Sequence, residues 1–476
     1  MIGILANKFM LINRYTINLL INSFPGFISI FLSFFSIPIY LKFLGYEEYG
    51  NYLILHIFLS ITMITNLNLG KIASIRIQKV NFFQTKKIIF TTLLVSFLSS
   101  SIITLIIFCL LTFLFSFYEF RIFENNIFIY CALFITNVYV TLENLCKGKK
   151  FFKLTSLSNF VFYSLSISLP SFVLIFDITD YKTALDLFKI SFFFKVLGIL
   201  ILAVFLLCKK LINFGSISKI IIQDFKYFAK WQTLSAIYMQ IFDFLDKYII
   251  KIILGSGALA IYSIPQQIAG KLSLVSDALI SVFLPRISSK LNKNKKYQIL
   301  NSNFYSFFYL LGFPIILSVP FLNDLTIWWL GESASIQIVH LFKIFTIASF
   351  YICITHIIST FYDTNFESKK NSLIDTIVLM FFLVGLVISL SSGNIYYFAY
   401  TILGKSIFSF ILKLTFINHH IIKFKILILQ NAIFISAFIF QMREDYYLYT
   451  ISCLIFLILL MTTAPLALIK KEFLND

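Results

Sequence analysis

Long apolar runs follow one another along the whole chain and are separated by short polar segments. A helix that crosses a bilayer needs about 20 mostly apolar residues, so this pattern predicts about fourteen transmembrane helices. The predicted spans are residues 17–41, 51–69, 88–113, 127–145, 155–176, 187–208, 231–253, 258–284, 304–322, 336–362, 373–390, 395–417, 426–441 and 447–468. The predicted fold class is therefore all-α, and the protein is expected to be a polytopic membrane protein.

The composition agrees with this fold class. The 476 residues are 59% hydrophobic and only 13% charged, whereas soluble proteins are about 45–50% apolar and about 25% charged. In a soluble protein the formal net charge of +18 would suggest nucleic-acid binding. A chain that is apolar from end to end excludes nucleic acid as a partner, and membrane lipids are its expected surroundings.

Lysine and arginine residues concentrate in every second connection between the predicted spans. The basic connections are residues 70–87, 146–153, 209–230 and 285–303, while the other connections hold most of the loop carboxylates. Because short basic loops stay in the cytoplasm, the alternation predicts a cytoplasmic (inner) membrane protein with both termini in the cytoplasm. The regular alternation also favours an even number of spans.

The two halves of the chain resemble each other at a fixed spacing. Leu44, Gly45 and Tyr52 match Leu254, Gly255 and Tyr262, which lie 210 residues further along. The matched segments are six spans apart, and an even number of spans gives both the same orientation in the membrane. The match therefore predicts two parallel six-helix bundles. Each glycine is expected to adopt a positive φ in a turn between two helices.

This repeat defines the predicted domain organisation. The N-terminal bundle is expected over residues 1–208 and the C-terminal bundle over residues 231–417. A basic cytoplasmic linker at 209–230 joins them, and residues 418–476 add two transmembrane helices and a cytoplasmic tail.

Several ionisable residues fall deep inside predicted spans, where a charge is costly and is therefore a functional candidate. Lys271 has no carboxylate three or four residues away on its own helix, so its partner must be another helix, water or a substrate phosphate. Gln266 and Gln267 lie about one turn from it. The substrate-binding candidates are Lys271, Gln267, Gln266, Lys195, Lys405 and His56, and Lys343 is a weaker one. A bundle histidine with its hydrogen bonds satisfied is the alternative interpretation of His56.

Asp243 and Asp246 are the candidates for binding a coupling cation or proton. The alternative for Asp243 is purely structural, because Lys247 follows it at the i,i+4 spacing of a local ion pair. Five further charged residues fall near the ends of spans, where long side chains reach the headgroups at little cost. These predicted interfacial anchors are Glu143, Lys189, Lys251, Asp375 and Lys413.

Four stretches of sequence resemble the polysaccharide-biosynthesis flippases, the O-antigen repeat-unit (Wzx-like) family of the multidrug/oligosaccharidyl-lipid/polysaccharide exporter superfamily. They are LGYEEYGNY (44–52), NLNLGKIASIR (66–76), FDFLDKYIIKIILGSGALAIYSIPQQIAGKL (242–272) and VFLPRIS (282–288). The resemblance implies an undecaprenyl-diphosphate-linked oligosaccharide that passes from the cytoplasmic to the periplasmic leaflet by alternating access. It also implies Lys271 and the Asp246–Lys247 pair as site residues, and a polysaccharide polymerase and a chain-length regulator as partners.

The absence of catalytic motifs indicates that the chain is not an enzyme. The sequence contains no GxxxxGK[ST], HExxH or GxSxG motif and no CxxC pair, so no catalytic residue, metal site or cofactor is predicted. Transport must then use an ion gradient, the membrane potential or the substrate gradient.

Two alternatives to the repeat-unit flippase remain. The first is another transporter of the superfamily, either a flippase for a lipid-linked peptidoglycan precursor or a multidrug/cation antiporter. A membrane polysaccharide polymerase or glycosyltransferase is disfavoured, because the loops are too short to form a catalytic domain.

Overall fold

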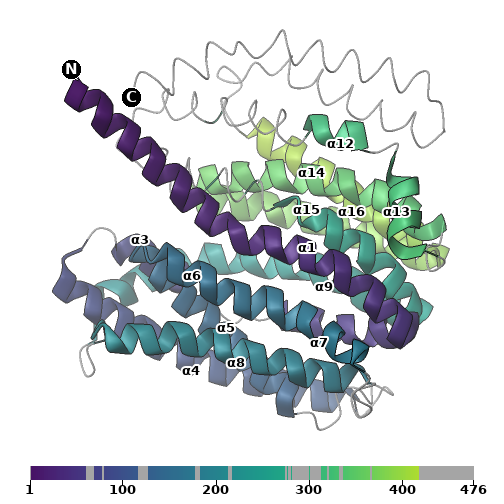
Figure 1. Cartoon of the computed structure of the whole chain (residues 1–476), viewed down its shortest axis with the longest axis horizontal. Coiled ribbons are helices and arrows are strands. Elements are labelled where there is room, and N and C mark those ends of the chain that lie inside the picture. The colour runs from purple at the N-terminus through teal and green to yellow at the C-terminus, as the bar shows by residue number, and fades with distance from the viewer. Residues whose placement is uncertain are drawn as a thin grey trace. The chain divides into compact units, whose positions relative to one another are not determined.

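The computed structural model describes residues 2–60, 69–77, 80–115, 127–176, 183–212, 217–273, 312–318, 321–331, 336–364 and 367–416, and the single positions Ser276, Ile280 and Leu300. The described elements are α1 (Ile2–Ser60), α3 (Leu69–Ile77), α4 (Phe82–Phe115), α5 (Ile127–Gly148), α6 (Phe152–Asn159), the π-helix η1 (Phe160–Leu165), α7 (Ser166–Ile175), α8 (Ala184–Cys208), α9 (Lys219–Gly270), α12 (Phe313–Ser318), α13 (Leu322–Leu330), α14 (Ile336–Thr364), α15 (Ser368–Ser392) and α16 (Ile395–Thr415). Every described element is a helix (Figure 1).

The predicted all-α, polytopic membrane fold is confirmed. Within the described ranges, nine helical stretches are long and apolar enough to cross a membrane. The predicted spans 426–441 and 447–468 lie outside the described residues, as does most of 304–322. Because α9 begins at Lys219, the second half of the predicted 209–230 linker is helical where the structure describes it.

The two repeated glycines have almost the same backbone conformation, as the sequence predicted. Gly45 interrupts α1 with φ 73° and ψ 177°, and Gly255 interrupts α9 with φ 89° and ψ 172°. This region of φ/ψ space is accessible essentially only to glycine. Each long helix is therefore two helices joined by a turn that depends on a residue without a Cβ.

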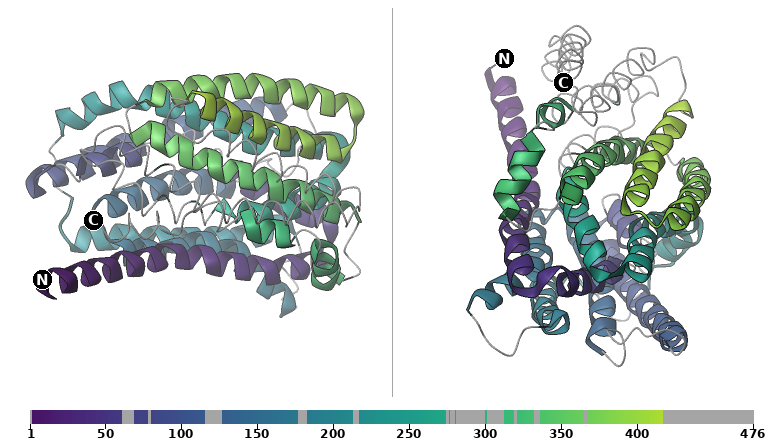
Figure 2. Two further views of the ribbon diagram at one scale, coloured as in Figure 1. Left: turned by 90° about the horizontal axis from the view of Figure 1, so that it is seen from above. Right: turned by 90° about the vertical axis from the view of Figure 1, so that its right-hand side faces the viewer.

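The chain forms two compact units. Unit 1 comprises residues 1–264 with 386–395, and unit 2 comprises residues 265–385 with 396–476. In unit 1, α5 packs against α3, α4 and α8, and these helices run alongside one another (Figure 2). The predicted division into two six-helix bundles stays a prediction.

The outer surface of α15 carries the apolar stripe expected of a helix in lipid. Large side chains are exposed at Leu373, Ile377, Met380, Val384 and Val387, which recur at the three- to four-residue spacing of one helix face. A contiguous apolar stripe of this length is unfavourable in water. The hydrocarbon of a bilayer solvates it instead.

Several hydroxyl groups within the spans donate hydrogen bonds to their own helices. Thr91 and Thr92 donate to the carbonyl oxygens four residues earlier, over 2.8 Å each, and Thr136 donates to Ala132 over 2.7 Å. A hydroxyl can therefore enter the membrane without an unpaired donor. Serine and threonine can consequently occur within the spans at a lower cost than charged residues.

Two of the basic connections meet at the same end of unit 1. The ring of Phe82 lies 5.0 Å from the Lys86 ammonium and 5.3 Å from the Lys149 ammonium. Partial burial lowers the pKa of Lys149. The connections 70–87 and 146–153 therefore lie on one side, which agrees with the charge alternation along the sequence.

Candidate functional site

Lys195 is buried in the interior of unit 1. It lies near the middle of the apolar helix α8 and is only 4% exposed. Its Nζ lies 4.4 Å from the centre of the Phe162 ring, and no carboxylate pairs with it among the described residues. A lysine at the bilayer centre costs about 2.5–3.5 kcal/mol, while a desolvated cation–π contact contributes about 2 kcal/mol. The ring thus offsets much of the cost and leaves the positive charge unneutralised.

The ring of Phe162 is held in place from its other face. Tyr139 of α5 stacks on it with centroids 3.6 Å apart and an interplanar angle of 5°, so Lys195 must occupy the opposite face. Phe162 belongs to the π-helix η1, and a Cβ on Gly198 of α8 would meet the Phe162 Cβ at 2.8 Å. A π-helix inserts an extra residue into a turn. Here that turn lies directly against the buried lysine.

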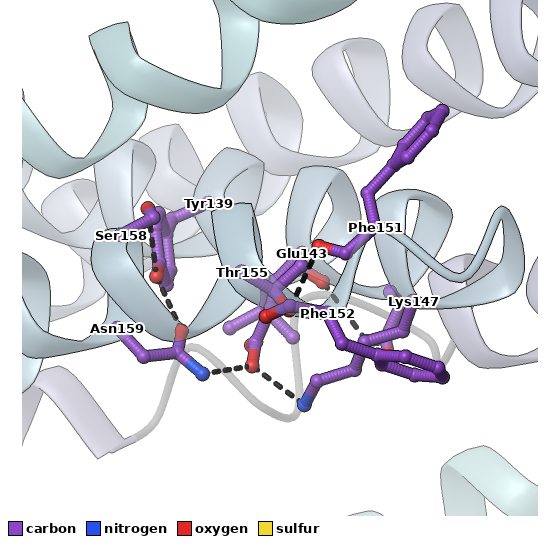
Figure 3. Close-up of polar contacts among 10 residues, drawn as sticks. Tyr139, Glu143, Lys147, Phe151, Phe152, Thr155, Ser158 and Asn159 are labelled. Atoms are coloured by element: carbon purple, nitrogen blue, oxygen red, sulfur yellow. Dashed lines mark hydrogen bonds and ion pairs between the residues drawn. The ribbon is translucent and has the colours of Figure 1, made fainter. Parts of the chain in front are cut away.

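A polar network fixes Tyr139 (Figure 3). Its hydroxyl donates to the Asn159 Oδ1 over 2.5 Å, and the Asn159 Nδ2 donates to the Glu143 Oε1 over 2.7 Å. The same carboxylate oxygen pairs with the Lys147 Nζ at 2.6 Å. The prediction that Glu143 is an interfacial anchor was wrong: Glu143 is buried, because Asn159 and Lys147 satisfy its charge inside the helix packing.

His56 lies beside this cluster. Its ring contacts Tyr52 and Phe188 edge-on, with centroids 4.6 Å and 5.4 Å away, and its Nε2 is buried with no hydrogen-bond partner among the described residues. Phe188, which the imidazole contacts, belongs to α8, the helix of Lys195. Unit 1 therefore brings together two of the predicted site residues, His56 and Lys195.

Asp246 and Asp243 have different surroundings on α9. Asp246 is fully buried, and its Oδ2 accepts a hydrogen bond from Tyr262 over 2.6 Å across the Gly255 turn. Asp243 is exposed, and the nearby Lys247 Nζ donates to its backbone carbonyl over 2.7 Å. Of the two candidates for ion coupling, only Asp246 is enclosed by protein, and the role of both stays a prediction.

The turns at Gly45 and Gly255 lie next to each other in unit 1. The Ser256 Oγ donates to the Asn51 Oδ1 over 2.8 Å, and a Cβ on Gly50 would overlap the carbonyl oxygen of Ser256. The Glu48 Oε2 accepts a hydrogen bond from the backbone amide of Ala184, the first residue of α8, over 3.2 Å. We call the packing of Gly50 and Asn51 against Ser256 the turn contact.

The glutamines and Lys271 belong to unit 2. Helix α9 ends at Gly270, and Lys271 lies in the turn that follows, so it is not in the middle of a continuous helix as the predicted span 258–284 implied. The Gln266 Oε1 is buried without a hydrogen-bond partner in the described part of the chain. The roles of Lys271, Gln266 and Gln267 stay predictions.

Two buried lysines of unit 2 lie in the spans α14 and α16. Lys405 is 7% exposed and its Nζ lies 5.6 Å from the centre of the Phe382 ring of α15. Lys343 is buried in α14. The structure therefore places Lys405, like Lys195, against the ring of a phenylalanine from another helix.

Asp375 and Lys413 form a buried ion pair, which corrects the prediction that both are interfacial anchors. The Lys413 Nζ lies 2.7 Å from the Asp375 Oδ1 and donates to the Ser359 Oγ over 2.7 Å. The pair connects α15, α16 and α14, and Lys413 is 1% exposed. Each charge can stay in the protein interior because the other neutralises it.

Removing one member of this pair should destabilise the protein strongly. Asp375→Ala leaves a buried ammonium without a counter-charge, which costs about 3–5 kcal/mol, so the thermal unfolding temperature of the purified protein in detergent should fall clearly. Asp375→Leu combined with Lys413→Met removes both charges and should restore most of the loss. The matched control is Lys189→Ala, because Lys189 pairs with Asp186 at the surface. Equal melting temperatures for Asp375→Ala and the control would contradict the role of the pair.

Sequence reasoning missed the aromatic and amide residues around Lys195. Tyr139, Asn159 and Phe162 carry no charge, and nothing in their spacing distinguishes them from ordinary span residues. Tyr52 did give a signal through the repeat: like Tyr262, it is buried and bonds across its turn, since its hydroxyl accepts a hydrogen bond from the Tyr40 hydroxyl over 3.3 Å. Within the described residues no group of His, Cys, Asp and Glu side chains could hold a metal ion.

Comparison with known proteins gives one family and one fold. The sequence model of the family described as "Polysaccharide biosynthesis protein" matches residues 16–291. No curated relative matches the chain significantly. Solved structures of MOP superfamily transporters resemble the chain at only 14–15% sequence identity. At this identity the likeness is evidence for the fold alone.

Three solved structures illustrate this likeness. An inward-facing multidrug resistance MATE family transporter of the MOP superfamily is 15% identical, with a TM-score of 0.62 over 81% of this chain and 94% of that one. An outward-facing multidrug resistance MATE family transporter of the MOP superfamily is also 15% identical, with a TM-score of 0.61 over 83% of this chain and 93% of that one. A MOP superfamily transporter from Pyrococcus furiosus, described by the reverse polarity of its binding pocket, is 14% identical with a TM-score of 0.53 over 84% and 95%.

Proposed function

The chain belongs to the polysaccharide biosynthesis protein family, and on this basis we propose that it is a flippase for an undecaprenyl-diphosphate-linked oligosaccharide repeat unit. The oligosaccharide is of the O-antigen or capsule type. It moves from the cytoplasmic to the periplasmic leaflet of the inner membrane, and both termini of the chain face the cytoplasm. A polysaccharide polymerase and a chain-length regulator are its proposed partners.

The observation that carries the proposal is the buried ammonium of Lys195. Its charge rests on an aromatic ring rather than on a carboxylate of the described chain, so it is available to attract an anion. A diphosphate linker is the anionic part of the proposed substrate, and its attraction to a lysine is strong where water is excluded. The same chemistry disfavours an organic cation, which a buried lysine repels.

The turn contact supports alternating access as the mechanism. It joins the turns of the first and the second repeat, which the charge pattern assigns to the periplasmic side. A substrate can leave on that side only if the two turns separate, so the contact has to break once in each cycle. Asp246 is the better placed of the two candidates for coupling this step to an ion gradient, because it is buried.

Transport in proteoliposomes tests the proposed function. The purified protein should carry a fluorescent undecaprenyl-diphosphate oligosaccharide across the bilayer, measured as the labelled lipid that becomes accessible to an impermeant glycosidase. Liposomes without protein are the control. Transport of a lipid-linked peptidoglycan precursor or of a fluorescent organic cation instead of this substrate would contradict the proposal.

A further inference from the structure

We propose that the lysines at one end of unit 1 bind the phosphates of anionic phospholipids in the surrounding bilayer. We call these residues the lysine strip; they are Lys86, Lys149, Lys150, Lys209 and Lys210. They lie near the start of α4, in the turn after α5 and in the turn after α8. The charge alternation along the sequence assigns this end to the cytoplasmic leaflet. The proposal does not depend on which substrate the protein transports.

The ring of Phe82 joins two lysines of the strip. Its centre lies 5.0 Å from the Lys86 Nζ and 5.3 Å from the Lys149 Nζ. The described residues supply neither ammonium with a carboxylate. Two ammonium groups near one ring repel each other, and the ring brings no net negative charge. A phosphate beside both would offset the repulsion, so this part of the strip favours an anionic ligand.

A second aromatic contact joins the two turns that contain lysines. Phe151 directly follows the turn after α5, and its ring packs edge-on against Phe205 of α8 with the centroids 5.0 Å apart. The centre of the Phe205 ring also lies 5.9 Å from the Lys209 Nζ. The two turns therefore lie side by side at the same end of unit 1, and their lysines belong to one basic surface.

Both turns hold a lysine in a backbone conformation that favours glycine. Lys150 has φ 63° and Lys210 has φ 50°, and every other described residue with a positive φ is a glycine. In both turns an amide donates to the carbonyl oxygen five residues earlier, over 3.0 Å after α5 and 3.1 Å after α8. Glycine is the usual residue at this position of a helix-ending turn, because a Cβ makes the left-handed conformation costly. Backbone strain of this kind is typical of functional sites, and a strained lysine in both turns points to a shared anionic ligand.

The surroundings of the strip favour a phospholipid of the bilayer as this ligand. Large apolar side chains are exposed along one face of α8 at Leu200, Val204 and Leu207, directly before the turn with Lys209 and Lys210. An acyl chain can lie on this face while its headgroup reaches the lysines, and lysines near a membrane surface attract anionic lipids. The strip extends over three helix ends, which suits several separate headgroups better than one diphosphate.

Binding of phosphatidylglycerol to the purified full chain in a neutral detergent tests the proposal. Native mass spectrometry gives the dissociation constant, and phosphatidylcholine, which has no net charge, is the comparison. Phosphatidylglycerol should bind more tightly than phosphatidylcholine. The variant that combines Lys150→Gly with Lys210→Gly removes two charges and should weaken phosphatidylglycerol binding about 30-fold, which corresponds to about 2 kcal/mol. Its binding of phosphatidylcholine should not change.

The thermal unfolding temperature of this variant separates a role in binding from a role in folding. Glycine adopts a positive φ without the strain that a lysine has there. Without added lipid, the variant should therefore unfold at the same temperature as the unchanged protein or at a higher one. A lower temperature would show that the lysines serve the turns themselves, and it would overturn the proposal.

The control combines Lys42→Gln with Lys189→Gln and also removes two charges. Lys42 lies against the exposed ring of Phe43, and Lys189 lies near the start of α8, at the other end of this helix from Lys209. The control should leave phosphatidylglycerol binding unchanged.

Three further results would overturn the proposal. Phosphatidylglycerol could bind no more tightly than phosphatidylcholine, or the double glycine variant could bind it no more weakly than the control does. The double glycine variant could also lose affinity only for undecaprenyl diphosphate, measured in the same way, which would make the strip a site for the substrate instead of the bilayer lipid. Absence of transport in proteoliposomes would refute the proposed function and leave this proposal standing.

Discussion

A disulfide across the turn contact is expected to stop transport completely. In the variant that combines Asn51→Cys with Ser256→Cys, the two thiols belong to residues whose side chains are in contact, with 2.8 Å between the Asn51 Oδ1 and the Ser256 Oγ, and oxidation is expected to join them. Once oxidised, the bond prevents the two turns from separating. Transport in proteoliposomes should fall to the level of empty liposomes and recover when a reductant is added.

The single substitutions serve as controls for this variant, because the chain has six cysteines of its own. Asn51→Cys and Ser256→Cys alone should transport at close to the normal rate with and without oxidant. If the oxidised double variant still transported the substrate while the cross-link was complete, the turn contact would not need to open. Alternating access through this end of the molecule would then be excluded.

Replacing Lys195 with alanine is expected to reduce the specificity constant for transport about 100-fold. Loss of one partner from a buried charged contact costs about 2–5 kcal/mol, and each factor of ten corresponds to about 1.4 kcal/mol. The effect should appear as weaker binding of the lipid-linked diphosphate, because the missing group is the one that attracts it. The initial rate of flipping is measured over a range of substrate densities.

Lys189→Ala is the matched control, because this lysine lies on the same helix but is exposed and paired with Asp186. It should transport at the normal rate. Lys195→Arg keeps the charge and should retain more activity than Lys195→Ala. A normal specificity constant for Lys195→Ala, with the protein present at its usual level, would remove Lys195 from the site.

The repeated turns show how far local sequence information reaches. Gly45 and Gly255 were predicted to have positive φ from their matched surroundings, and both do. The conformation of a tight turn depends on a few residues that are adjacent in the sequence. A backbone conformation that only glycine tolerates can therefore be predicted from the sequence alone. The depth of Lys195 and Lys405 in their spans was predictable for the same reason, since hydropathy along the chain locates the middle of a helix.

Contacts between helices were not predictable in this way. Asp375 and Lys413 fall near the ends of their spans, and position alone suggested two independent anchors in the headgroups. Their ion pair exists because α15 and α16 are rotated so that the two side chains face each other. Helix rotation depends on the packing of whole surfaces, and the charge of either residue gives no information about it.

The sequence by itself determined that this chain is a helical membrane protein and where its two repeated glycine turns lie. These properties depend on residues that are adjacent along one helix. Only the tertiary structure decided what each buried charge meets: a carboxylate for Lys413, an amide and a lysine for Glu143, and the face of a ring for Lys195. The reason is physical, because the free energy of a buried charge depends on the atoms within a few ångströms of it, and here those atoms come from other helices.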